Sequence, residues 1–316
     1  MDDLPPLPLV DFPNDALGEV IHWLTPERLA MLIDATDLRA DTPKAKIRAL
    51  AETAVRLCCA SVCVNPVEVD LLPRLLAGTG VKECYVVDFP LGKSTIAMKA
   101  HQAARLVAES RAIRREGKGW VELDMVINVG RFRDDPEHTW REVAAVVDAA
   151  DGEVVKIIIR SSELRNEEIT LACRIAQEAG AHFVKNSTGM EAFGATPEHI
   201  RRMREAVGPG MGVKAAGGIR TAADAVRLVL AGAPTPDLRV PERLRLGTSS
   251  PTGLLSTLER LQEDLTTAIP CSYCPSGYAE KQSPELRAAA LALCSRCPHR
   301  HRREEWLSLL YRPPSP

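Results

Sequence analysis

The sequence predicts an α/β fold, a closed (β/α)8 TIM barrel followed by a small C-terminal zinc-binding extension. Short Val/Ile-rich runs alternate with longer Ala/Arg/Glu-rich stretches from about residue 30 to residue 250, a pattern typical of βα repeats around a parallel sheet. The chain has 316 residues, and a barrel of this kind needs about 250. Near residue 269 the composition changes abruptly and a Cys-containing segment begins, which marks the extension.

Eight Val/Ile-rich runs can be distinguished, and this number favours a closed barrel. We expect one strand in each run. The predicted strands are residues 31–36, 61–66, 83–90, 121–128, 153–160, 181–187, 212–218 and 243–250.

The segments between these runs are predicted to be scaffold helices. In one of them, Thr196 is a suitable N-cap and Pro197 occupies the first helical position. The segment 232–242 is too rich in Pro to be regular, so we expect a loop at the surface there, and a closing helix after residue 250. We divide the chain into an N-terminal extension (1–29), the barrel (30–268) and a C-terminal extension (269–316).

The composition favours small-molecule metabolism. A net charge of -2 with 26% charged residues gives no strong field of either sign, which argues against a nucleic-acid or membrane-surface partner. No run approaches 18 apolar residues, and the acidic, Pro-rich N-terminus is unlike a signal peptide. We therefore expect a cytoplasmic location.

In a parallel barrel the chemistry gathers where strands end in loops, and three charged residues of the predicted strands stand out there: Asp124, Lys185 and Lys214. A lysine that points into a closed barrel loses solvation, which only a role or a partner offsets. A second cation beside a buried amine lowers the pKa of that amine and turns it into a nucleophile near neutral pH. We expect Lys185 to be a Schiff-base nucleophile, Lys214 to supply the second charge, and Asp124 to move protons. The alternative for a single strand lysine is a snorkelling or salt-bridged side chain.

Glycine-containing turns follow the last three predicted strands, where barrels commonly build a phosphate site. Backbone N–H groups in these turns, together with the N-terminus of the helix after residue 250, can hold a dianion. The predicted binding residues are Thr188, Gly189, Gly217, Gly218, Gly247, Ser249 and Ser250.

Seven sequence motifs occur in the order found in the deoxyribose-phosphate aldolase family, which the chain resembles over about residues 30–260. They are ASVCVNP (60–66), FPLG (89–92), ELDMVINVG (122–130), HFVKNSTG (182–189), GAT (194–196), VKAAGGIRT (213–221) and RLGTSS (245–250).

The resemblance implies a class I aldolase that cleaves 2-deoxy-D-ribose 5-phosphate into D-glyceraldehyde 3-phosphate and acetaldehyde, without a metal or an organic cofactor. By motif, Lys185 is the Schiff-base residue, Lys214 the lysine that perturbs it and Asp124 the proton-relay carboxylate. The resemblance also implies that Cys63 lines the substrate pocket and that Asp34 lies near the substrate hydroxyls.

The chain departs from the family pattern at three positions. The family commonly has Thr at Asn186, Gly at Asp88 and Glu at Arg160. We expect Asn186 and Asp88 to lie near the mouth of the pocket, and Arg160 either to add a charge there or to form a surface ion pair. Two alternative functions therefore stay open: a Schiff-base aldolase acting on a different short aldehyde or sugar phosphate, and a non-catalytic sugar-phosphate scaffold or sensor.

The C-terminal extension contains two CxxC pairs separated by nineteen residues. This spacing predicts a closed, structural Zn²⁺ site, although two disulfides, a redox pair or an iron–sulfur cluster also fit it. The extension is expected to cap the barrel or to mediate a homo-oligomer, with a dimer favoured. In the family a tail tyrosine can reach the active site, and the candidates here are Tyr273, Tyr278 and Tyr311. The predicted ligands are Cys271, Cys274, Cys294 and Cys297.

Overall fold

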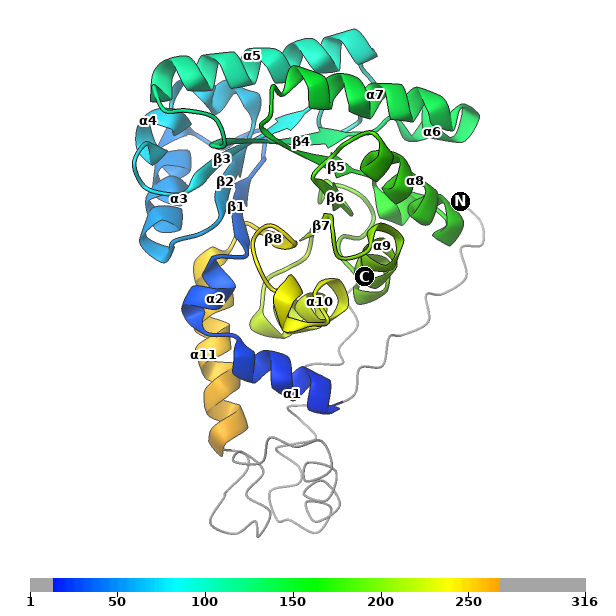
Figure 1. The fold of residues 1–316 in the computed structure, drawn as a ribbon. Helices are drawn as coiled ribbons and strands as arrows, with labels where there is room; N and C mark the ends of the chain where they lie inside the picture. Colours follow the sequence, from blue (N-terminus) through cyan, green and yellow to red (C-terminus); the bar gives the residue numbers. More distant parts are fainter. Residues whose placement is uncertain (1–13, 268–316) are drawn as a thin grey trace.

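The computed structural model describes residues 14–267, which form a closed barrel of eight parallel strands surrounded by helices (Figure 1). Neighbouring strands in the chain are neighbours in the sheet, and β8 pairs with β1 to close it. The strands are β1 (Ile33–Asp37), β2 (Ser61–Val64), β3 (Lys82–Val87), β4 (Val121–Val126), β5 (Val154–Ile158), β6 (Phe183–Lys185), β7 (Gly212–Ala216) and β8 (Leu244–Thr248).

All eight predicted strands are confirmed, but β2 to β8 end two or three residues before the predicted ends. The extra residues lie in the turns that follow the strands. At Asp88 and Gly217 the backbone φ angles are +52° and +90°, so the chain leaves the extended conformation there.

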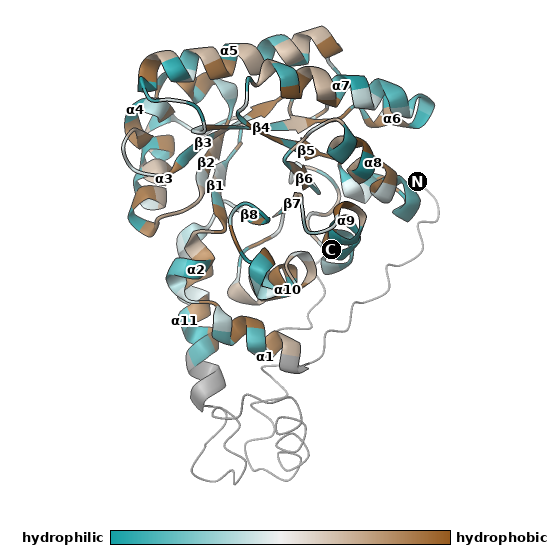
Figure 2. Cartoon of the chain, viewed as in Figure 1, coloured by the Kyte–Doolittle hydropathy of each residue, from teal (hydrophilic) through white to brown (hydrophobic). Residues whose placement is uncertain are grey.

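The outer layer consists of helices that cover the barrel wall with their apolar residues, and Figure 2 shows hydrophobic and hydrophilic residues alternating around them. In α9, Thr196 is the N-cap and accepts a hydrogen bond from the N–H of His199, as predicted. The helices after β1 are α3 (Lys44–Leu57), α4 (Leu72–Leu76), α5 (Ile96–Arg114), α6 (Val129–Asp134), α7 (Pro136–Ala149), α8 (Asn166–Glu178), α9 (Pro197–Val207), α10 (Ala222–Gly232) and α11 (Pro251–Thr267).

Two helices precede the barrel, α1 (Asn14–Trp23) and α2 (Pro26–Ala30), and they pack against α10 and α11 respectively. Leu17, Val20, Ile21 and Leu24 are fully buried. The side-chain amide of Gln262 in α11 donates to the carbonyl oxygens of Ile21 and Leu24. The N-terminal segment is therefore part of the hydrophobic core.

The Pro-rich segment after α10 is only partly at the surface. Residues 234–237 are exposed, whereas Arg239 is fully buried and stacks over the ring of Trp23 at 5.5 Å. Its guanidinium donates to the carbonyl oxygens of Ala233 and Pro234 and pairs with Glu19 at 2.9 Å. The expectation of a surface loop is therefore confirmed for residues 234–237 but not for Arg239, which anchors α1.

Within residues 14–267, none of the helices combines the length and the apolar character of a membrane span. The cysteines predicted to bind zinc and the three tail tyrosines lie outside the described residues.

Candidate active site

The inside of the barrel contains a cluster of seven charged side chains, here called the charged cluster. They project from six of the eight strands, and each is between 0% and 3% exposed. Burial of an unpaired charge costs several kcal/mol, so such a cluster is stable only if its members pair with one another. The members are Asp34, Glu122, Asp124, Lys156, Lys185, Lys214 and Arg245.

Asp124 lies at the centre of the charged cluster and contacts three lysines. Its Oδ2 atom accepts hydrogen bonds from Lys185 Nζ and Lys214 Nζ, both at 2.8 Å, and its Oδ1 atom accepts from Lys156 Nζ at 2.9 Å. Burial raises the pKa of Asp124, but the three ammonium groups outweigh burial and hold that pKa well below its ordinary value. The carboxylate is therefore ionised.

Lys214 has a second carboxylate, because its Nζ atom also lies 2.6 Å from Oδ2 of Asp34. Burial lowers the pKa of Lys214, but Asp124 and Asp34 outweigh burial and raise it above its ordinary value. Lys214 therefore remains a cation. Lys185 has Asp124 as its ion-pair partner among the described residues.

Three further members of the charged cluster escaped the sequence analysis: Lys156, Glu122 and Arg245. Arg245 donates to Asp34 Oδ1 at 2.6 Å and to both oxygens of Glu122, and Lys156 lies 2.6 Å from Glu122 Oε2. The sequence contains the features that could have identified two of them. Lys156 interrupts the apolar run VVKII, and Glu122 precedes Asp124 by two residues, which places both carboxylates on the same face of the strand.

Two thiols lie beside Asp124. Cys84 Sγ is 3.1 Å from its Oδ1 atom and Cys63 Sγ is 3.9 Å from its Oδ2 atom. Both cysteines are fully buried. Cys63 is thus next to the charged cluster, but it does not line the cavity above Lys185.

A cavity of about 370 Å³ opens above Lys185 and contains most of the predicted binding residues. Two arginines that the sequence analysis missed, Arg39 and Arg220, also line it and are exposed. Among the described residues, the backbone N–H groups of Gly218 and Ser249 donate no hydrogen bond, whereas Ser250 donates its N–H to Thr248 Oγ1. The predicted residues that line the cavity are Lys185, Thr188, Gly189, Gly217, Gly218, Gly247 and Ser249.

Asp34, Asp124 and Lys214 lie beneath the cavity rather than in its wall, and Ser250 lies outside the lining. Lys185 is consequently the one lysine of the charged cluster that lines this cavity. The cluster can therefore act on a ligand through the Lys185 amine, while the other charges act on that amine from below.

The three departures from the family pattern have structural explanations. Asp88 has the positive φ that favours glycine, and its carboxylate accepts from the N–H and hydroxyl of Ser94. The side-chain oxygen of Asn186 accepts from the N–H of Ala216 at 2.7 Å. Neither residue is part of the lining of the cavity above Lys185, although Asn186 is hydrogen-bonded to Ala216, which lines it. Arg160 forms an ion pair with Glu163, as in the second alternative given for it.

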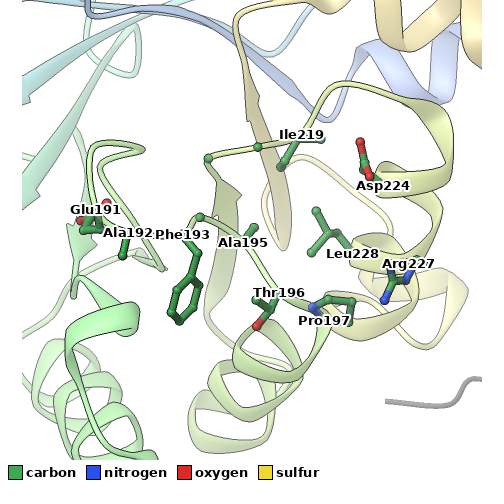
Figure 3. Close-up of a pocket in the computed structure, with 13 residues that line it drawn as sticks. Glu191, Ala192, Phe193, Ala195, Thr196, Pro197, Ile219, Asp224, Arg227 and Leu228 are labelled. Atoms are coloured by element: carbon green, nitrogen blue, oxygen red, sulfur yellow. The ribbon is translucent and has the colours of Figure 1, made fainter. Parts of the chain in front are cut away.

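A second cavity, of about 490 Å³, lies between the loop after β6 and helix α10 and shares Gly217, Gly218 and Ile219 with the first. Figure 3 shows its walls, with Glu191 and Phe193 on one side and Ile219, Asp224 and Leu228 on the other. The two cavities are thus separated by the glycine turn that follows β7.

Comparisons with known proteins agree with this geometry. The model of the DeoC/LacD aldolase family matches residues 28–262. A deoxyribose-phosphate aldolase of Clostridium perfringens is 46% identical over 209 residues, covering 66% of this chain and 89% of the relative. Deoxyribose-phosphate aldolase 1 of Bacillus licheniformis is also 46% identical over 209 residues, which are 66% of this chain and 90% of the relative.

Among solved structures, the deoxyribose-phosphate aldolase of Aeropyrum pernix, described as having a unique tetrameric structure, superimposes with a TM-score of 0.68 at 32% identity. The superposition covers 79% of this chain and the whole of that one. Fold, family model and sequence identity all lead to the same conclusion: this chain is an aldehyde-lyase that belongs to the DeoC/LacD family of aldolases.

Proposed function

We propose that the chain cleaves 2-deoxy-D-ribose 5-phosphate into D-glyceraldehyde 3-phosphate and acetaldehyde through a Schiff base on Lys185. One observation carries the proposal: Lys185 and Lys214 share a single oxygen of Asp124, and of the two only Lys185 lines the cavity. The names of the Clostridium and Bacillus relatives support the choice of substrate.

Lys185 has fewer carboxylate partners than the other lysines of the charged cluster. It holds four cations and three carboxylates, so one ammonium group lacks a carboxylate of its own. Lys214 contacts Asp34 as well as Asp124, and Lys156 contacts Glu122 as well as Asp124. Lys185 contacts Asp124 alone within residues 14–267, and it is the lysine of the charged cluster that faces the cavity.

The reaction then follows from the position of this amine. The neutral Lys185 nitrogen attacks the C1 aldehyde of the open-chain sugar, and loss of water gives an iminium ion. Removal of the proton from the C3 hydroxyl breaks the C2–C3 bond, releases glyceraldehyde 3-phosphate and leaves an enamine on Lys185. Protonation at C2 and hydrolysis release acetaldehyde. Asp124 and Lys214, whose charges are fixed by their partners, position Lys185 and assist the proton transfers through water.

The phosphate group is assigned to the turns after β7 and β8. Among the described residues, the N–H groups of Gly218 and Ser249 donate no hydrogen bond, and they lie in these turns, close to the N-terminus of α11. Arg220 lines the same cavity and adds positive charge, whereas Arg39 is paired with Asp37.

The test is borohydride trapping with 2-deoxyribose 5-phosphate, followed by peptide mass spectrometry. A reduced adduct is expected on Lys185 and is expected to be absent from Lys185→Met. The matched control is Lys44→Met, which changes an exposed lysine outside the barrel and should trap normally. An adduct on a different lysine, or none in folded protein, would contradict the proposed mechanism, and trapping with a different aldehyde would identify a related aldolase instead.

The extension carries two further proposals, which rest on the sequence alone. We propose that Cys271, Cys274, Cys294 and Cys297 bind one structural Zn²⁺ ion, with the CxxC spacing as support. Mass spectrometry for metals should find about one zinc per chain, and a Cys271→Ser change should remove it. We also propose a homo-oligomer, a dimer by expectation, which light scattering would test. A cytoplasmic location stays a prediction.

A further inference from the structure

The loop between β6 and α9 folds around the carboxylate of one of its own residues, Glu191. The hydroxyl of Ser187 donates to this carboxylate at 2.6 Å, the N–H of Thr188 at 3.0 Å and the N–H of Gly189 at 3.1 Å. The Glu191 side chain is 1% exposed. Burial raises the pKa of Glu191, but the hydrogen bonds from Ser187 and Thr188 outweigh burial and bring it below its ordinary value. The group is therefore an anion.

Successive backbone N–H groups that converge in this way form the kind of concavity in which proteins bind phosphate. Here an internal carboxylate already occupies it. Thr188 and Gly189 also line the cavity above Lys185, so the donors that Glu191 engages are withdrawn from any ligand in that cavity.

The Glu191 carboxylate also lies next to the turn assigned to the substrate phosphate. Glu191 lines the second cavity together with Gly217 and Gly218 (Figure 3). The loop packs tightly against this turn, since a Cβ atom added to Gly217 would lie 3.3 Å from both Gly189 Cα and Ser187 Oγ. A negative charge behind the turn opposes the binding of a dianion in front of it.

Arg160 compensates this charge only in part. Its Nε atom lies 3.8 Å from Glu191 Oε1, and the same guanidinium also pairs with Glu163. The chain thus combines a cation that follows β5 with a carboxylate in the loop after β6.

We propose that Glu191 is a specificity-determining residue that weakens the binding of the substrate phosphate. The Glu191 carboxylate accepts the hydrogen bonds of Ser187, Thr188 and Gly189 and places a negative charge behind the Gly217–Gly218 turn. It thereby reduces the ratio of kcat/KM for phosphorylated aldehyde donors to kcat/KM for unphosphorylated ones. The inference rests on the proposed function, because it concerns the phosphate of that substrate.

The test is Glu191→Gln, which keeps the length of the side chain and one acceptor oxygen but removes the charge. The KM for 2-deoxyribose 5-phosphate and the inhibition constant of inorganic phosphate should both fall, by about five- to twenty-fold for a unit charge acting on a dianion through partly hydrated protein. The kcat/KM for unphosphorylated 2-deoxyribose should change less than about two-fold. The matched control is Glu163→Gln, an exposed carboxylate on the same arginine, whose charge is screened by solvent and whose removal should change either constant by less than about two-fold.

A second variant, Arg160→Met, tests the opposite direction. It leaves the Glu191 charge without its compensating cation, so inorganic phosphate should bind more weakly than to the wild type. Equal changes for both sugars in Glu191→Gln, or weaker phosphate binding by that variant, would overturn the proposal and indicate a structural role for Glu191. Failure of the wild type to cleave either sugar would contradict the proposed function instead, and calorimetric titration with inorganic phosphate would still decide the role of Glu191.

Discussion

The adjacent glycines of the turn after β7 allow a matched test of the geometry of the proposed phosphate site. Gly217 and Gly218 both have positive φ angles, +90° and +77°. A Cβ atom at Gly217 would lie 2.8 Å from Gly194 Cα, whereas at Gly218 it would meet nothing within 4 Å. The two Ala substitutions therefore share backbone strain, and only Gly217→Ala adds a clash with neighbouring backbone.

The magnitudes follow from these two contributions. An L-residue in the left-handed region costs about 1–2 kcal/mol, which applies to both variants. Overpacking against backbone that has no side chain to move adds about 1–3 kcal/mol for Gly217→Ala alone. We therefore expect a loss of about 1–2 kcal/mol in the free energy of unfolding for Gly218→Ala and about 2–5 kcal/mol for Gly217→Ala.

Urea denaturation followed by circular dichroism measures this difference directly, provided that the slope of the transition stays the same in both variants. A parallel measurement of KM for the phosphorylated sugar should show a larger increase for Gly217→Ala, because the clash displaces the turn. Equal losses of stability would refute the reasoning, since they would mean that the loop containing Gly194 can move away at no cost.

Three further predictions concern buried charges and a buried histidine. Lys214→Met should lower kcat at least about 100-fold in a steady-state aldol-cleavage assay, because Asp124 and Asp34 lose their shared cation and the proton relay fails. Lys99→Met should lower the free energy of unfolding by about 3–5 kcal/mol in the same urea experiment, because it leaves the Glu142 carboxylate buried without the amine now 2.6 Å away. Burial lowers the pKa of His199 from 6.5 to about 4, so between these pH values the unfolded chain binds more protons than the folded one. Stability should therefore fall by up to about 3 kcal/mol as the pH decreases through this window, and His199→Gln should lack that decrease.

The barrel was predictable because its determinants are local. A parallel strand buried on both faces requires an apolar run, and each run here is bounded by turn-forming residues such as Asp88 and Gly217. The N-terminal helix α1 was not identified in the sequence analysis. Its role depends on the burial of residues such as Leu17 and Val20 and on the packing of α1 against α10, a segment far away in the chain.

The part of the site around Lys185 and Lys214 was predictable, because a lysine inside an apolar strand of a closed barrel indicates a chemical role. Lys156 and Arg245 were missed because a strand cation becomes significant only when its carboxylate partners are known, and these come from β1 and β4. The role of Glu191 could not be deduced either. Its significance lies in the direction of the Thr188 and Gly189 N–H groups, which depends on the three-dimensional path of the loop.

The sharing of Asp124 among three lysines has a consequence for the evolution and engineering of this protein. All three lysines pair with the one carboxylate of Asp124. Because they share this partner, the effects of substitutions within the charged cluster on stability and activity cannot be additive. A variant that loses Lys156 alone leaves Glu122 undercompensated, whereas simultaneous neutralisation of both removes the pair as a unit. Mutant libraries that change one position at a time will therefore find few tolerated substitutions in the charged cluster. Libraries that change both members of an ion pair together can find other functional combinations of residues.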